Sequence, residues 1–208
     1  MNNIGVNNTG VRAARNILVL LGLCVGVSAV AAPIPRFLPN RDVAVTYQLN
    51  LPGRDPQTYL LRYDAADQLA RIDSPAQHLF ILANLPSGQA QLVVPALHAV
   101  VDTPDFSGIA QQIENARGAQ FTPLGSGHYA GLRCQRYRIT SRDGEAQACI
   151  TPNGVVLQFD GHNRHGAAEA TAISVAFTPQ PGEEFSAPAD FANIHLSPGM
   201  LAALLQAP

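Results

Sequence analysis

The sequence predicts a mainly β (α+β) fold, in which one curled antiparallel half-barrel sheet wraps over one or two helices. Short segments of alternating apolar and polar residues recur about every ten residues, separated by turn-forming residues, which is typical of an antiparallel meander. An amphipathic helix interrupts these strands, and its apolar stripe needs a concave surface to pack against. A closed eight-stranded barrel is the alternative, because alternation alone does not separate the two architectures.

The first strand begins at Asp42 and shows the alternation most clearly. Its apolar side chains share one face: Val43, Val45, Tyr47 and Leu49. A turn rich in Pro, Gly and Asp follows at 51–56. Further strands are predicted at 57–64, 68–73, 78–85, 89–94 and 97–101.

Two helices are predicted, with four more strands between them. The first helix runs between Asp105 as its N-cap and Gly118 as its stop, and its apolar stripe is Phe106, Ile109, Ala110, Ile113 and Ala116. The intervening strands are 133–140, 146–151, 155–160 and 170–178. The second helix is short, covers 197–206, and carries the stripe Met200, Leu201, Leu204 and Leu205.

The N-terminus has the order of a secretory signal peptide: two arginines, an apolar run over 17–27 and a small-residue segment. We expect cleavage after Ala31, so that residues 1–31 are a signal peptide and 32–208 form a single β-rich domain. As a helix, the apolar run spans roughly 16 Å, much less than a bilayer core of about 30 Å. An uncleaved anchor and a lipoprotein signal at Cys24 are the alternatives, and the expected location is the periplasm.

Two cysteines, Cys134 and Cys149, remain after cleavage. An even pair in an exported protein predicts one disulfide, which closes a loop of about 16 residues and contributes roughly 3 kcal/mol. A redox-active pair is the alternative, but the fourteen intervening residues do not match the C-x-x-C spacing of such pairs.

Composition excludes some classes of function. The formal net charge is −2, all 13 basic residues are arginine and there is no tryptophan. A nucleic-acid partner is therefore not expected, because such proteins need a basic face and aromatic platforms. Without lysine, a Schiff-base or phosphate-loop mechanism is not available to the chain.

Several polar clusters are candidates for chemical sites. Asp160, His162 and His165 have ligand types that suit zinc or copper, but they follow a strand and are expected to form a solvated turn. Ser126 and His128 do not match a nucleophile elbow, and this segment is expected to be a glycine-rich connection. The sequence therefore predicts no catalytic residue, no metal site and no cofactor.

Charged residues cluster in two further segments of the chain. Glu183 and Glu184 are adjacent and are expected to point apart on a loop. Arg133, Arg136 and Arg138 form a basic patch on one predicted strand, which either receives an anionic lipid headgroup or a carboxylate, or faces solvent.

Three structural motifs carry a resemblance that covers 42–191. They are G-x-x-C-x-x-Y over 131–137, C-x-[ST]-x-[DN]-G-V over 149–155 and F-x-x-P over 185–188. With these motifs the chain resembles uncharacterised exported bacterial proteins whose fold is similar to the periplasmic carriers of the lipoprotein-localisation pathway. The resemblance implies an open half-barrel with a helical lid and an apolar cavity for acyl chains. It implies no catalytic residue.

The leading hypothesis is an exported, non-enzymatic protein that binds a lipid or another apolar ligand. The expected ligand-binding residues are Val45, Tyr47, Tyr59, Leu61, Tyr63, Phe106, Ile109 and Ile113. Ordinary core packing of these same residues is the alternative. The second hypothesis is an envelope module that binds a protein partner through an exposed apolar patch or an uncovered edge strand. The sequence does not indicate the oligomeric state.

Overall fold

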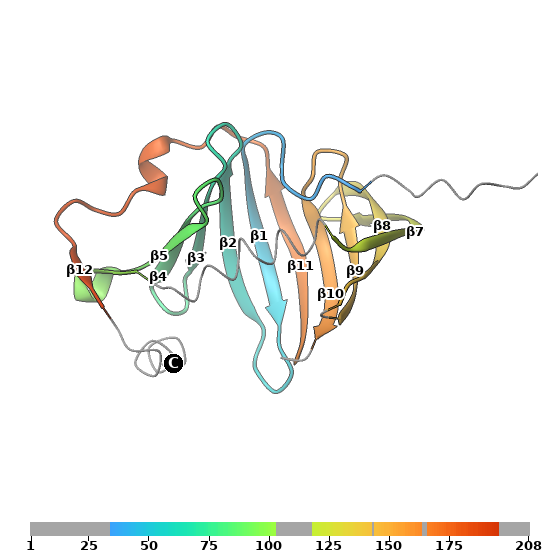
Figure 1. Cartoon of the computed structure of the whole chain (residues 1–208), viewed down its shortest axis with the longest axis horizontal. Helices are drawn as coiled ribbons and strands as arrows, with labels where there is room; N and C mark the ends of the chain where they lie inside the picture. Colours follow the sequence, from blue (N-terminus) through green and yellow to red (C-terminus); the bar gives the residue numbers. More distant parts are fainter. Residues whose placement is uncertain (1–33, 103–117, 143, 164–165, 196–208) are drawn as a thin grey trace, which may run out of the picture. The chain divides into compact units, whose positions relative to one another are not determined.

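A computed structural model describes residues 34–102, 118–142, 144–163 and 166–195, all within one compact unit, Ala32–Pro208. These residues contain twelve strands in one sheet, with the order β12-β6-β5-β4-β3-β2-β1-β11-β10-β9-β8-β7. Neighbouring strands pair antiparallel except β12 and β6, which are parallel. The mainly β fold class predicted from the sequence is confirmed (Figure 1).

The first six strands form the expected meander. Their bounds are β1 Val43–Asn50, β2 Gln57–Asp64, β3 Leu69–Ser74, β4 Leu79–Asn84, β5 Gln89–Val94 and β6 Ala99–Asp102. The predicted strand 97–101 begins too early, because a 3-10 turn, η1 (Pro95–Leu97), precedes β6. Pro95 lacks the N–H that a ladder requires, and His98 closes the turn in the left-handed conformation, with φ of 46°.

The remaining strands form the other half of the sheet. Their bounds are β7 Gln120–Tyr129, β8 Leu132–Thr140, β9 Gly144–Ile150, β10 Val156–Asn163, β11 Gly166–Ala176 and β12 Ala192–Ile194. β11 pairs with β1 and thereby joins the two halves. Both predicted helices, around Phe106–Ala116 and over 197–206, lie outside the described residues.

Two expectations about connections are wrong. The segment with Ser126 and His128 is not a connection but part of β7, which pairs with β8. Pro and Gly are tolerated there because β7 is an edge strand. The segment with Asp160 and His162 is not a solvated turn but the end of β10, where His162 lies opposite Glu145.

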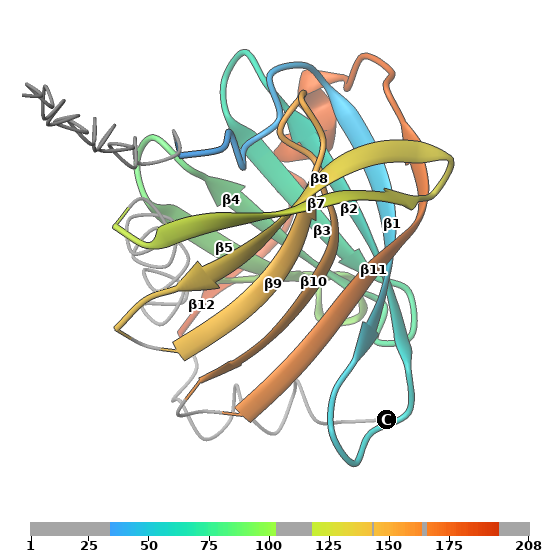
Figure 2. The same ribbon diagram turned by 90° about the vertical axis from the view of Figure 1, so that its right-hand side faces the viewer.

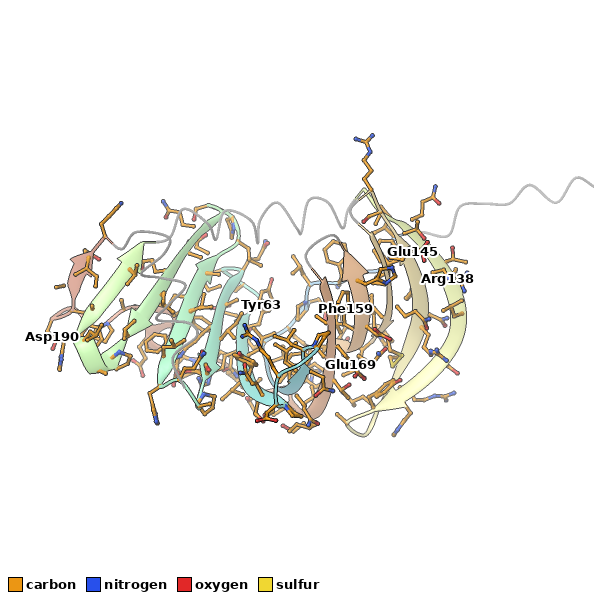
Figure 3. The ribbon with its side chains drawn as sticks, turned by 90° about the horizontal axis from the view of Figure 1, so that it is seen from below. Tyr63, Arg138, Glu145, Phe159, Glu169 and Asp190 are labelled. Atoms are coloured by element: carbon orange, nitrogen blue, oxygen red, sulfur yellow. A yellow bond between two sulfur atoms is a disulfide. The ribbon has the colours of Figure 1, made fainter. Side chains whose placement is uncertain are left out.

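The sheet is open and curled, as Figures 2 and 3 show, so the half-barrel is confirmed and the closed barrel is wrong. β7 and β12 are its two edges and do not pair with one another. The largest buried cluster of the described residues draws its members from β2, β1, β11, β10, β9, β8 and the residue before β10, and contains Val43, Val45, Tyr63, Cys134, Cys149, Val155, Leu157 and Ala172.

A cluster of charged side chains on β2 and β3 holds the segment after β11 against the meander. The Asp73 carboxylate pairs with both Arg62 and Arg71, and Arg71 also lies 3.8 Å above the Phe80 ring. Arg71 Nη1 donates to the Glu184 carbonyl at 3.1 Å, and the Glu184 carboxylate lies 3.6 Å from the same atom. The loop expected at Glu183 and Glu184 is therefore a 3-10 turn, η3 (Gly182–Phe185), that contacts β2 and β3.

Candidate functional site

A continuous line of aliphatic side chains crosses one face of the meander. Directly paired residues of neighbouring strands share a face. Following the pairs from β1 to β12 gives one such line, here named the aliphatic row: Val45, Leu61, Ile72, Ile81, Leu92, Val101 and Ile194. The row arises because each strand places an apolar residue at the same register position.

The residues beside the aliphatic row differ on its two sides. On one side a tyrosine on β2 is followed by small residues on β3, β4 and β5: Tyr63, Ala70, Ala83 and Ala90. On the other side Tyr47 lies opposite Tyr59. In Figure 3, Tyr63 and Phe159 lie on the concave side of the sheet, so the aliphatic row belongs to that side.

Burial divides the aliphatic row. Val45 and Leu92 have no exposed surface and act as core. Leu61, Ile72 and Ile81 are half-buried in neighbouring strands β2, β3 and β4. These three neighbouring side chains form the accessible apolar part of the row on β2 to β4, and Ile194 at the end of the row on β12 is half-buried as well.

The five predicted ligand residues on β1 and β2 are brought together on one face by the strand register. Val45 and Tyr63 belong to the buried cluster, whereas Tyr47, Tyr59 and Leu61 are half-buried. The other three predicted ligand residues, Phe106, Ile109 and Ile113, lie outside the described residues. Sequence reasoning missed Ile72 and Ile81. Alternation around Ile72 was available as a signal, whereas Ile81 lies in the run 79–82, which is apolar on both faces and carries no such signal.

Tyr47 is anchored rather than free. Its hydroxyl donates to the Val156 carbonyl at 2.7 Å, and burial raises the pKa of the phenol above its ordinary value. Burial and the nearby Asp64 also raise the pKa of Tyr63. Tyr47 and Tyr63 therefore stay neutral at physiological pH, and the half-buried Tyr47 presents part of its ring to the concave side.

We expect Tyr47→Phe to lower the free energy of unfolding by about 1 kcal/mol at neutral pH, because the Val156 carbonyl loses its partner. Above about pH 10 the phenol ionises in the unfolded chain but stays neutral in the folded one, so wild-type stability falls as pH rises. Urea denaturation at neutral pH and at about pH 10.5 measures both effects. Identical pH dependence in the two proteins would contradict this role of Tyr47.

Cys134 and Cys149 form a disulfide between β8 and β9, with a Cα–Cα distance of 5.3 Å. Gly127 on β7 leaves room for it, because a Cβ atom there would lie 2.7 Å from Cys149 Sγ. Both sulfurs are buried, which is typical of a structural rather than a reactive pair.

The other polar candidates do not converge. Among the described residues no group of three or more His, Cys, Asp and Glu side chains could hold a metal ion. His165 lies outside the described residues. The basic patch also divides: Arg136 and Arg138 share one face of β8, and Arg133 points to the opposite face, because side chains alternate along a strand.

Comparison with known proteins identifies solved structures with a similar fold but assigns the chain to no family. No protein-family model and no curated protein matches the chain. The fold is similar to an uncharacterised conserved protein from Thermus thermophilus, with a TM-score of 0.55 and 11% identity over 76% of this chain and 91% of that chain. It is also similar to a chain of the MucA/MucB complex of Pseudomonas aeruginosa, with a TM-score of 0.52 and 11% identity over 74% of this chain and 58% of that chain.

A LolA superfamily protein from Nitrosomonas europaea also matches, with a TM-score of 0.36 and 11% identity over 75% of this chain and 94% of that chain. At 11% identity, the two similarities with TM-scores above 0.5 show a shared fold and nothing more. In the part of the chain that the structure describes, no helix has the length and apolar character to cross a membrane.

Proposed function

We propose that this protein is an exported, non-enzymatic binding protein that takes an acyl chain or another apolar ligand on the concave side of its sheet. Residues 1–31 would be removed as a signal peptide, and residues 32–208 would act in the periplasm. The observation that carries the proposal is the half-buried part of the aliphatic row, where Leu61, Ile72 and Ile81 lie side by side on three strands.

The physical basis is the favourable transfer of an apolar ligand from water. On the concave side Leu61, Ile72 and Ile81 keep part of their apolar surface exposed, and aliphatic side chains bind without directional demands. Tyr59 extends this surface, and its hydroxyl is already bonded to Gln57 Oε1 at 2.6 Å. The disulfide supports export, because such bonds persist in oxidising compartments.

Two leucines that follow one another on β2 supply a matched test. Leu60 and Leu61 are both half-buried, but they point to opposite faces of the sheet. We expect the double variant Leu61→Ala/Ile81→Ala to bind the neutral apolar fluorophore N-phenyl-1-naphthylamine about tenfold more weakly. Leu60→Ala should bind it as wild type does, as measured by fluorescence titration.

Mass spectrometry of protein purified from the periplasm tests occupancy and processing together. A denatured mass of 32–208 less two hydrogens would support the cleavage and the disulfide. A native mass higher by an extractable apolar molecule would support the ligand. A bare native mass, together with no fluorophore uptake, would contradict the proposal.

The second candidate is a module that binds a partner protein. It is supported by β7, an edge strand with mostly exposed side chains, including Leu124, and by the similarity to a chain of the MucA/MucB complex. An edge strand presents unpaired backbone groups that a partner strand can use. Co-purification of one defined protein would favour this candidate. If truncation at Ser197 abolished the co-purification, the predicted C-terminal apolar stripe would be part of the binding surface.

A further inference from the structure

A separate recess lies where the segment before β1 meets β8, β9 and the turn after β9. Its volume is about 410 Å³, within the range of roughly 300–1,000 Å³ that small-molecule sites occupy. Arg36 lines it from the N-terminal segment, and Arg133, Gln135 and Tyr137 line it from alternating positions of β8. The recess shares no residue with the aliphatic row.

The charged side chains that line this recess from the described residues are all positive. Among the described residues that line it, both charged side chains are arginines and none is acidic, although the whole chain has a net charge of −2. Arg133 is exposed and makes no hydrogen bond or ion pair with any other residue that the structure describes. Arg36 Nη1 donates to the side-chain oxygen of Asn40 at 2.7 Å when that amide is oriented with its oxygen toward the guanidinium. Most of the Arg36 donors then have no partner among the residues that the structure describes.

One wall of the recess is apolar and held in place. Tyr137 meets the Phe121 ring edge-on at a centroid distance of 6.0 Å, and Phe121 stacks on Phe37 at 6.4 Å. Ile150, which is 3% exposed, completes this wall. Because Phe37 follows Arg36 in the chain, the aromatic contacts also position the Arg36 guanidinium beside the recess.

We propose that this recess binds a small organic oxyanion, in which a phosphate or carboxylate group is attached to an apolar body. The guanidinium groups of Arg36 and Arg133 pair with the charged end, since their forked donors match such oxyanions. Tyr137 and Ile150 contact the apolar body. This site goes beyond the proposed function and stands without it, because it uses other residues and another ligand chemistry.

Arg138 supplies a matched control for Arg133. It lies on the same strand, is also exposed, and makes no hydrogen bond or ion pair with the described residues, but it points to the opposite face. We expect the purified protein to bind phenyl phosphate and benzoate in calorimetric titrations. Arg36→Ala and Arg133→Ala should each weaken this binding about tenfold or more, and Arg138→Ala less than about twofold.

Two further probes separate the charged end from the apolar body. Phenol, which lacks the oxyanion, should not bind, and inorganic phosphate should bind more weakly than phenyl phosphate. Equal losses in Arg133→Ala and Arg138→Ala would overturn the proposal, because they would indicate nonspecific charge attraction. So would wild-type binding in Arg133→Ala, or no binding of either organic anion. N-phenyl-1-naphthylamine uptake, measured in the same variants, reports on the concave side independently.

Discussion

The double variant Cys134→Ala/Cys149→Ala is expected to lose roughly 3 kcal/mol of unfolding free energy. The disulfide joins residues separated by 15 positions, so it removes loop-closure entropy from the unfolded chain. For a domain of this size the loss corresponds to a fall in Tm of about 6–12 °C. Both cysteines are buried members of the largest described core cluster, so the missing atoms also reduce packing there.

Thermal and urea denaturation with and without reductant separate these contributions. Reductant should lower the stability of the wild type by most of the roughly 3 kcal/mol and leave the double variant unchanged. If the double variant were as stable as the oxidised wild type, the bond would contribute nothing and a structural role would be wrong. A second readout is hydrogen exchange in β8 and β9, which should increase when the link between them is absent.

The meander could be predicted from the sequence because two local signals agree there. Val43, Val45 and Tyr47 alternate with polar residues, and turn-forming residues separate each strand from the next. Local alternation predicts the apolar positions of β1 and β2. The pairings of Leu61 with Ile72 and of Ile72 with Ile81 needed the structure, as did the strand β12 that carries Ile194.

The edge strand β7 could not be predicted in this way. Pro123, Gly125 and Gly127 favour a connection by local propensity, but an edge strand tolerates them because one of its sides has no ladder to maintain. Gly127 is explained only by the disulfide that packs against it. A constraint of this kind comes from a residue on another strand and leaves no local pattern.

The recess of Arg36 and Arg133 illustrates the same limit for the candidate sites. The two arginines are separated by 97 positions, and no spacing rule connects them. On β8 the sequence indicated a patch of three arginines, whereas strand alternation separates Arg133 from the other two. The sequence does not indicate where the N-terminal segment lies, and it is this position that brings Arg36 to the recess.

That position depends on Gly154, and Gly154→Ala is expected to displace the N-terminal segment. Gly154 has φ of +88°, and a Cβ atom there would lie 2.2 Å from the Leu38 carbonyl oxygen and 2.9 Å from Arg36 Cγ. The backbone of Leu38 cannot yield as a flexible side-chain end can, so the segment has to move. Phenyl phosphate binding should then fall about tenfold or more, because Arg36 leaves the recess.

Gly53 is the matched control for this substitution. Its φ of +74° is similar, but a Cβ atom there would meet nothing within 4 Å. Gly53→Ala should therefore show only the left-handed strain, about 1–2 kcal/mol, whereas Gly154→Ala adds the loss of the Phe37 contact with Phe121. The backbone N–H of Asn40 donates to the Asn153 carbonyl oxygen at 3.0 Å, and its hydrogen exchange should accelerate in Gly154→Ala but not in Gly53→Ala. Equal stability losses and unchanged Asn40 protection would mean that the turn after β9 does not hold the segment, and that Arg36 is positioned by its aromatic neighbour instead.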